Sequence, residues 1–262
     1  MPASYTHAVY GVQVLEKLDA ETRNRITPYI DYYNIGLHGP DILFFYKPVS
    51  SNPVKKLGYE MHTLPARGFF EESRKKIASS SDPDAALAYI LGFINHFVLD
   101  SLCHPYIYQH QDDTGLSHSE IESEWDRELM VREGKDPIRS RSTTHLHPTE
   151  GCCRVIAPFF DVKPSQIKEA LKSMIWLLDM FVAPGKLKRG FILGVMSLVG
   201  MRESQGGLIF NYQPNPACVR FVDDRIRQMD SACDLSVKLI REYIEKLDTE
   251  LPLDPWYDED YE

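Results

Sequence analysis

One apolar stretch, residues 83–104, constrains the fold of this chain more than any other part of the sequence. It begins at Asp82 and Pro83, which suit a helix start because aspartate caps the free N–H groups and proline fits the first helical position. Apolar residues recur on nearly every face of the expected helix, so it should be buried almost all round. Pro105 is expected to end the helix near Cys103, because proline clashes with the preceding turn.

The remaining sequence carries helical periods and weak strand signals. Further helices are expected at 6–18 with Thr6 as cap, 27–35, 64–79, 117–132, 164–181, 187–200 and 216–247. Loops are expected at 36–41, 46–58 and 133–151. These signals predict a single all-α, multi-helix domain over residues 1–262. It would comprise a metal-ligand half (1–132), a helical C-terminal half (152–250) and an acidic tail (251–262) whose last residues, 256–262, should fray.

Composition narrows the class of protein. The formal net charge of −9 argues against broad capture of nucleic acid, which needs basic residues to neutralise phosphates. The five cysteines are odd in number and form no CxxC motif, which favours a reducing compartment. No signal peptide is recognisable near the first residue, and the apolar run 190–201 is shorter than the roughly 20 residues that span a bilayer. A cytoplasmic location is therefore expected.

Polar residues interrupt the apolar helix at a regular spacing. His96, Asp100 and His104 are four apart, so they share one helix face. His118 and Glu122 repeat this spacing, and all five fall within 27 positions. One such pair alone is more often a hydrogen-bonded core histidine and a surface acid. Two arrays this close favour a polynuclear site for zinc-like ions, since a buried carboxylate is costly unless it is paired or binds metal. Such a site indicates a hydrolase.

Three residues upstream extend the pattern. His7 lies in the first expected helix, Asp41 follows a Gly-Pro turn and His62 precedes another helix. Alone, each would more often be structural. The complete order is His7, Asp41, His62, His96, Asp100, His104, His118 and Glu122. This order resembles the zinc-dependent phospholipase C family, whose all-helical fold is shared with single-strand-specific zinc nucleases. The resemblance covers roughly residues 1–125 and is nearest to an intracellular bacterial branch.

The resemblance implies two or three zinc ions. The first would be held by Asp41, His62, His96 and Asp100, and the second by His104, His118 and Glu122. Asp100 would bridge to a third, bound also by His7 and the N-terminal amine and carbonyl. Asp41 is in addition the predicted catalytic residue, because a rigidly held carboxylate beside the ions could orient or deprotonate the attacking water.

Two departures from the family pattern bear on these assignments. Secreted relatives begin with a tryptophan whose amine binds metal, whereas this chain begins Met-Pro-Ala. If Met1 is removed, the amine of Pro2 would lie five positions before His7 and could coordinate. The family also places the next histidine six residues after the bridging aspartate. Here the step is four, which makes His104 the preferred ligand and His110 the alternative. HD-type phosphohydrolases fit poorly, because the sequence contains no adjacent His-Asp pair.

The resulting hypothesis is a zinc-dependent phosphoric diester hydrolase of the phospholipase C type. The alternatives are a nuclease or nucleotidase on the same site, and a non-hydrolytic metal-binding protein. The net charge favours a phospholipid or small phosphodiester substrate over nucleic acid, and a peripheral membrane contact would suit a lipid. No protein partner is evident. His38 or Glu60 could orient the ligand histidines.

Two sets of side chains bear on the substrate. The aromatic residues near the ligands could form an apolar lip or belong to the core. They are Phe44, Phe45, Tyr46, Phe69 and Phe70. The nearby basic residues could contact a nucleic-acid backbone, although a solvated face is the simpler interpretation. They are Lys55, Lys56, Arg74, Lys75 and Lys76.

Overall fold

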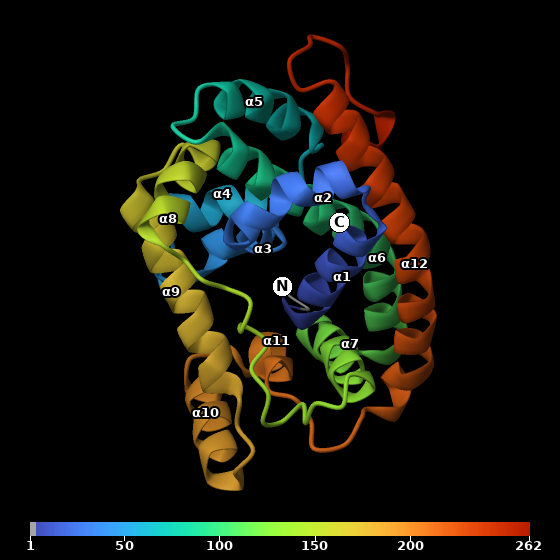
Figure 1. The fold of residues 1–262 in the computed structure, drawn as a ribbon. Coiled ribbons are helices and arrows are strands. Elements are labelled where there is room, and N and C mark those ends of the chain that lie inside the picture. Colours follow the sequence, from blue (N-terminus) through green and yellow to red (C-terminus); the bar gives the residue numbers. More distant parts are fainter. Residues whose placement is uncertain (1–3) are drawn as a thin grey trace.

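The computed structural model describes residues 4–262, and over this range the chain is helical without a β-strand (Figure 1). The prediction of an all-α fold is therefore confirmed. The helices are α1 Ser4–Lys17, α2 Ala20–Ile26, α3 Ile30–Gly36, α4 Pro53–His62, α5 Arg67–Ala78, α6 Pro83–Thr114, α7 His118–Arg132, α8 Glu150–Ile156, α9 Pro164–Phe181, α10 Lys186–Leu198, α11 Arg202–Gln205 and α12 Pro216–Glu245. Short 3-10 segments include η1 Thr27–Tyr29, η2 Gly39–Phe45, η4 Gly206–Leu208 and η5 Pro255–Asp258.

Helix α6 forms the centre of the fold, and α1, α3, α5, α7 and α12 all pack against it. It has the length and apolar composition of a membrane span, but 89% of its apolar window is buried inside the molecule, as in a core helix. The expected N-cap is present, since Asp82 accepts a hydrogen bond from Ala85 N at 3.2 Å. The N-terminal half of α6 is thus as the sequence predicts.

The predicted end of this helix near Cys103 is wrong, because α6 continues through Pro105 to Thr114. An internal proline removes one helical hydrogen bond, a loss of about 3 kcal/mol. Contacts with α12 hold the continued turns. The guanidinium of Arg225 lies 3.8 Å from the ring centre of Tyr106. The ring of His110 stacks on Phe221 at 4.4 Å. Tertiary packing therefore overrides a local stop signal.

Helix α1 begins before its predicted cap, because another helix caps it. Asp126 of α7 accepts hydrogen bonds from Tyr5 N at 3.1 Å and from Thr6 N at 2.7 Å. The Thr6 hydroxyl also donates to Asp126, so Thr6 lies inside the helix and the prediction of a Thr6 cap is wrong. Asp126 follows Glu122 by one turn, so this contact brings the start of α1, with His7, beside the ligand residues of α7.

Helices α3 and α6 cross with almost no space between their backbones. A Cβ atom on Gly36 would lie 2.1 Å from Tyr89 O, and one on Gly92 would lie 2.1 Å from Tyr33 O. Both positions therefore require glycine. This close approach lays η2, which follows α3, directly on α6. Asp41 in η2 is thereby placed near the ligand residues of α6.

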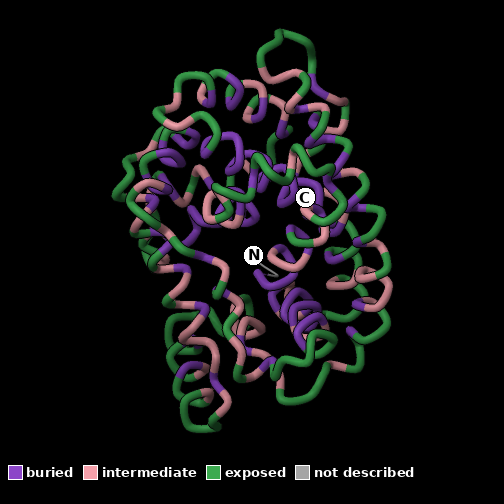
Figure 2. Tube along the Cα trace, in the orientation of Figure 1, coloured by how far each residue is buried: buried purple, intermediate pink, exposed green. Residues whose placement is uncertain are grey.

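Two further regions, one in each half of the chain, depart from the sequence prediction. The region 46–58, predicted to be a loop, contains the start of α4, which Asn52 caps through Lys55 N. Residues 256–262 of the acidic tail, predicted to fray, instead pack back onto the molecule, and Tyr257 and Tyr261 are fully buried. Figure 2 shows, by contrast, that α10 is mostly exposed. This helix lies at one end of the molecule and has a small apolar cluster of its own with Ala183 and Ile209.

Candidate metal centre

The eight residues predicted as metal ligands lie close together on α1, η2, α4, α6 and α7. All are buried except His118, which is partly exposed. Their donor atoms form three groups, and within each group every donor lies within 4.8 Å of the others. The groups are His7, His96 and Asp100; Asp41, His62 and His96; and His104, His118 and Glu122. The sequence prediction thus selects residues that the fold brings together, and their coordination of metal stays a prediction.

Several donor separations suit a shared ion. The Nε2 atoms of His7 and His96 lie 3.1 Å from the two carboxylate oxygens of Asp100. The Nε2 atom of His62 lies 3.0 Å from Asp41 Oδ1. Tetrahedral zinc with ligand distances near 2.0–2.2 Å separates its ligand atoms by about 3.4 Å. The first two groups therefore need only small adjustments to hold an ion.

The third group is built between α6 and α7. His118 Nε2 lies 3.1 Å from Glu122 Oε1, as the four-residue spacing predicts. His104 Nε2 faces the same oxygen from α6 at 3.7 Å. Two imidazoles and one carboxylate are a common protein ligand set for catalytic zinc, which keeps a further position open for water or substrate. The partial exposure of His118 places this group nearest to solvent.

Asp100 lies at the junction of the groups. Its Oδ1 atom faces His7 and also lies 3.9 Å from His104 Nε2, while Oδ2 faces His96. Burial alone would raise the pKa of this carboxyl, but the three histidines hold it well below its usual range. Asp100 is therefore a carboxylate at neutral pH, in contact with residues from all three groups.

His96 is shared by two groups, which modifies the predicted ligand sets. The structure joins Asp100 with His7 and His96, and joins His96 with Asp41 and His62. Each imidazole nitrogen has one lone pair, so a given nitrogen of His96 can bind only one ion at a time. Burial lowers the pKa of His96 to about 4, so the ring is neutral and needs no proton loss to coordinate.

Two features show that the residues fit a metal. The Nδ1 atom of His96 has no hydrogen-bond partner among the described residues, and Nε2 faces only Asp100 Oδ2, at 3.1 Å without hydrogen-bond geometry, although the side chain is fully buried. A buried polar atom without such a partner is costly unless something else satisfies it, and a metal ion would do so. Gly39, at φ +46°, packs on the same ring, where a Cβ atom would lie 2.0 Å from His96 Cδ2. The backbone of Gly39 thus packs directly against the ring, with no room for a side chain between them.

Backbone carbonyls orient two of the ligand histidines. The Nδ1 atom of His62 lies 2.7 Å from Gly58 O, and that of His104 lies 2.5 Å from Tyr261 O. Donation from Nδ1–H to a carbonyl leaves Nε2 free to bind metal. The predicted orienting residues serve elsewhere, since His38 contacts His145 (Nε2–Nε2 2.7 Å) and Glu60 pairs with Lys56. Sequence reasoning missed the carbonyls because a main-chain acceptor has no residue-type signal.

Two predicted ligand sets remain to be placed, namely His110 and the N-terminal amine and carbonyl. His110, the alternative to His104, stacks on Phe221 and belongs to none of the three groups found among residues 4–262. The predicted amine and carbonyl ligands of a third ion belong to residues 1–3, which lie outside the described part of the chain.

The aromatic residues divide between core and cavity. Phe69 and Phe70 pack on Phe93 in the core. Phe44 and Phe45 instead line an apolar cavity of about 300 Å³, together with side chains of α9 and α10. The ring of Phe44 also stacks on His62 at 5.1 Å. An apolar cavity therefore adjoins the ligand residues.

The basic residues considered for nucleic-acid binding have partners within the protein. Arg74 donates to the carbonyls of Lys246, Thr249 and Leu251. Lys56, Lys75 and Lys76 pair with Glu60, Glu72 and Asp161, and Lys55 donates to Pro48 O.

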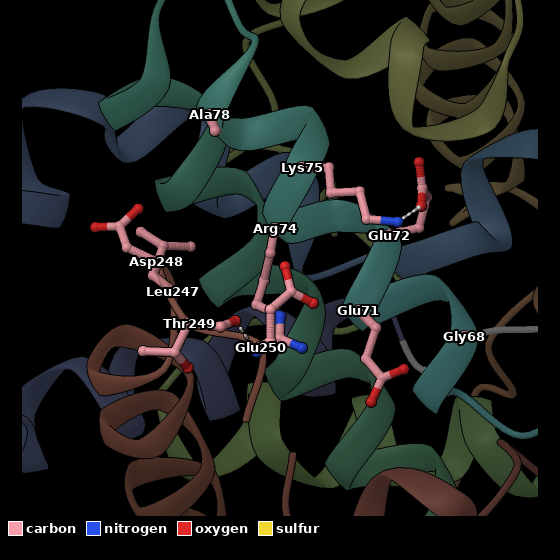
Figure 3. Close-up of a pocket in the computed structure, with 10 residues that line it drawn as sticks. All are labelled: Gly68, Glu71, Glu72, Arg74, Lys75, Ala78, Leu247, Asp248, Thr249 and Glu250. Carbon is pink, nitrogen blue, oxygen red and sulfur yellow. Dashed lines mark hydrogen bonds and ion pairs between the residues drawn. The ribbon is translucent and has the colours of Figure 1, made fainter. Parts of the chain in front are cut away.

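A second cavity of about 460 Å³ lies between α5 and residues 247–250 (Figure 3). It is lined by both acidic and basic residues, and none of the eight predicted ligands lines it.

Comparison with known proteins agrees with this arrangement. A family model described as zinc dependent phospholipase C matches residues 6–174, which include all eight predicted ligands. No curated protein sequence and no solved structure matches the chain.

Proposed function

Since this chain belongs to the zinc-dependent phospholipase C family, we propose that it hydrolyses phospholipid diesters at the three-group site. The observation that carries the proposal is the grouping of five histidines and three carboxylates, all but His118 buried and all within ligand distance in their groups, beside an apolar cavity. Zinc ions held there would lower the pKa of a bound water and offset charge on the phosphoryl oxygens.

Asp41 is the proposed catalytic residue. Burial would raise the pKa of its carboxyl, but the hydrogen bond from His62 and the nearby His96 hold that pKa below its usual value. Asp41 is therefore ionised and able to accept a hydrogen bond or a proton from water. Its position in η2, packed between α4 and α6, keeps the carboxylate fixed in direction.

The apolar cavity supports a lipid substrate. Its walls are formed by the aromatic residues of η2 and by apolar side chains of α9 and α10, and its polar lining is small. A cavity of about 300 Å³ admits part of an acyl chain or glycerol backbone, whereas a charged polymer gains nothing from such walls. Phe44 lines the cavity and its ring also stacks on His62, so a lipid bound in the cavity would lie one side chain away from the ligand residues.

Helix α10 supports a peripheral contact with a membrane. Leu187, Phe191 and Leu198 are 92%, 74% and 87% exposed. Residues 182–202 carry four basic residues and no acidic one, in a chain whose net charge is −9. Exposed apolar side chains flanked by lysine and arginine suit an anionic bilayer surface. Because α10 also forms a wall of the cavity, docking there would open the cavity toward lipid.

The test compares a soluble phosphodiester with anionic phospholipid vesicles, using zinc-loaded protein and a chelator control. We expect chelator-sensitive release of the phosphorylated head group from both. Leu187→Asp should lower the vesicle rate by about ten-fold or more, because one leucine contributes about 1.5–3 kcal/mol of transfer free energy. It should leave the soluble substrate unaffected. Val219→Asp, at an exposed apolar position of α12, is the matched control.

Three outcomes would count against the proposal. Activity that survives complete removal of metal would refute the metal-dependent mechanism. Degradation of single-stranded DNA in place of either diester would favour the nuclease alternative. One tightly held ion without turnover on any diester would favour a non-hydrolytic role. A cytoplasmic location and the absence of a protein partner stay predictions.

A further inference from the structure

Tyr261, in the tail 251–262, packs inside the molecule against the ligand residues. The Tyr261 side chain is almost fully buried, and its ring lies 5.4 Å from the ring of His62 and 5.9 Å from that of His96. It also packs edge-on against Phe97 at 5.1 Å. One wall of the metal centre is therefore supplied by residues more than 130 positions beyond the last predicted ligand.

The main chain of Tyr261 contacts two ligand histidines. Its N–H donates to His62 O at 3.2 Å. Its carbonyl accepts from Nδ1 of His104 at 2.5 Å, which fixes the tautomer of His104 and turns Nε2 toward Glu122. His62 and His104 belong to different groups of donors. The tail thus joins two parts of the site that α6 alone does not connect.

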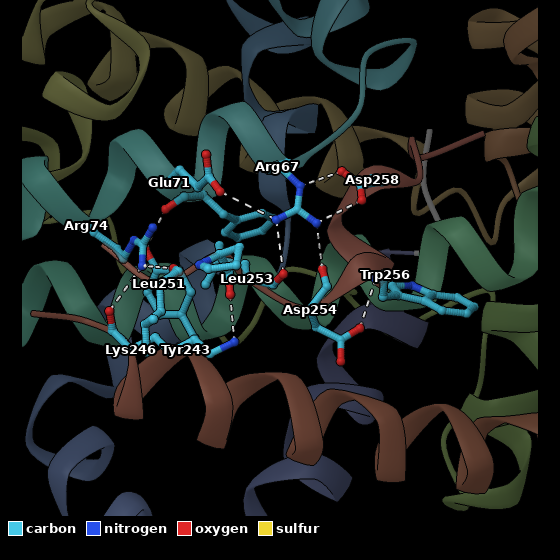
Figure 4. Close-up of polar contacts among 12 residues, drawn as sticks. Arg67, Glu71, Arg74, Tyr243, Lys246, Leu251, Leu253, Asp254, Trp256 and Asp258 are labelled. Atoms are coloured by element: carbon cyan, nitrogen blue, oxygen red, sulfur yellow. Dashed lines mark hydrogen bonds and ion pairs between the residues drawn. The ribbon is translucent and has the colours of Figure 1, made fainter. Parts of the chain in front are cut away.

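Two arginines of α5 hold the tail in this position. Arg67 donates to the carbonyls of Leu253 and Asp254 and pairs with Asp258 through two hydrogen bonds (Figure 4). Arg74 donates to two carbonyls just before the tail and to that of Leu251 within it, and Ala66 N donates to Glu259 O at 3.0 Å. A bidentate arginine–carboxylate pair fixes the relative orientation of its two side chains, so these contacts hold the tail in one position on α5.

We propose that Tyr261 is a positioning residue for the metal centre, so that tail docking and metal binding at His104 strengthen each other. The inference rests on the proposed metal-binding role of His104. A carbonyl that holds the ligand tautomer raises metal affinity, and hydrogen bonds of this kind typically change it by about 10–100-fold. By reciprocity, bound metal must stabilise the docked tail by the same factor.

The first test measures zinc affinity by competition with a chelating dye. A chain ending at Asp260 lacks Tyr261 and its carbonyl, whereas a matched control that ends at Tyr261 as a C-terminal amide lacks only Glu262 and keeps that carbonyl uncharged. We expect the first to bind zinc about 10–100-fold more weakly at one site, and the control to match the full chain. Nitrogen NMR of His104 in zinc-free protein, recorded above pH 9 where the ring is neutral, should show the Nδ1–H tautomer in the control and a mixture in the shorter chain. Equal affinities for the two truncated chains would refute the inference.

A second variant covers the case in which the shorter chain does not fold. Arg67→Gln loosens the tail from α5 without touching a ligand residue, and Lys75→Gln, at an exposed position on the same helix, is its control. Only Arg67→Gln should weaken zinc binding. Hydrogen exchange supplies the reciprocal measurement, since zinc should slow exchange in residues 255–262 of the full chain. Exchange there that is insensitive to zinc would contradict the coupling.

The outcomes separate this inference from the proposed function. Zinc binding with turnover but without a tail effect would refute the coupling and leave the hydrolase proposal standing. A tail effect on zinc affinity without turnover on any diester would support the coupling and refute the hydrolase proposal. A full chain that binds no zinc through His104 would refute both.

Discussion

Replacing Asp100 with asparagine tests whether one carboxylate serves more than one ion. The variant keeps the size of the side chain and removes only its charge. In the structure the carboxylate lies 3.1 Å from His7 and His96 and 3.9 Å from His104. An ion bound to any of these nitrogens on the side that faces Asp100 would lie within about 4 Å of the carboxylate, since zinc–nitrogen distances are about 2 Å.

The expected loss follows from Coulomb's law. Unit charges 4 Å apart interact by about 4 kcal/mol at an effective dielectric constant of 20, and a divalent ion doubles this value. If the amide dipole and rearrangement recover half, about 4 kcal/mol is lost per ion, or about 1,000-fold in dissociation constant. Because histidines from all three groups face Asp100, Asp100→Asn should release more than one equivalent of zinc.

The assay is elemental analysis of protein dialysed against a calibrated chelator, with circular dichroism to confirm helix content. Glu124→Gln is the matched control. It removes a buried carboxylate of α7 whose partners are Asn211 and Asn215 rather than histidine. The control should keep the full complement of metal. If Asp100→Asn also keeps it, Asp100 does not bridge, and the reasoning from its position is wrong.

Three further predictions concern pH, backbone and helix stability. The pKa of His104 is raised to about 9, since Asp100 and Glu122 outweigh the effect of burial. At pH 7 zinc must therefore displace a proton from His104 in order to bind. Calorimetry of zinc binding in buffers of different ionisation enthalpy should show the release of this proton. The same protonation stabilises the metal-free fold below the unfolded pKa of about 6.5, and this contribution is lost as pH rises through about 9. Gly39→Ala should lower the free energy of unfolding by at least about 1–2 kcal/mol and reduce zinc stoichiometry, because the new methyl group overlaps the His96 ring; a normal melt with full metal content would falsify this. Pro105→Ala restores an N–H that can donate to the carbonyl of Ser101, and it should raise the free energy of unfolding by about 1–2 kcal/mol. An unchanged or lower melting temperature would show that the helix does not need that hydrogen bond.

Local periodicity allowed much of the site to be predicted. The spacing of four brings His96 and Asp100 within 3.1 Å of each other on α6, and brings His118 and Glu122 equally close on α7. Within one helix, such contacts follow from the pitch alone. Bringing α6 and α7 together, and adding His7, needed the resemblance to a known family, because spacing says nothing about how helices pack.

The features that could not be predicted all depend on contacts with residues distant in the sequence. Asp126 caps α1 from another helix, although Thr6 is a better local candidate. Pro105 is a stop signal that contacts with α12 override. The acidic tail looks disordered by composition, yet two arginines of α5 bind its carbonyls. In each case the local signal is worth a few kcal/mol at most, and tertiary contacts of similar size decide the outcome.

The net charge of the site depends on how many ions it holds, and this net charge decides which phosphate ligand the site prefers. The three groups contribute three carboxylates, Asp41, Asp100 and Glu122, and neutral imidazoles when metal is bound. Two divalent ions would leave a net charge of about +1, which one phosphodiester monoanion neutralises, whereas three ions would leave about +3. In a buried site uncompensated charge is costly, so a two-ion centre should favour diesters and a three-ion centre dianionic phosphate. The ratio of the inhibition constants of a monoanionic diester and inorganic phosphate should therefore track the zinc content, and a ratio independent of that content would refute this electrostatic argument.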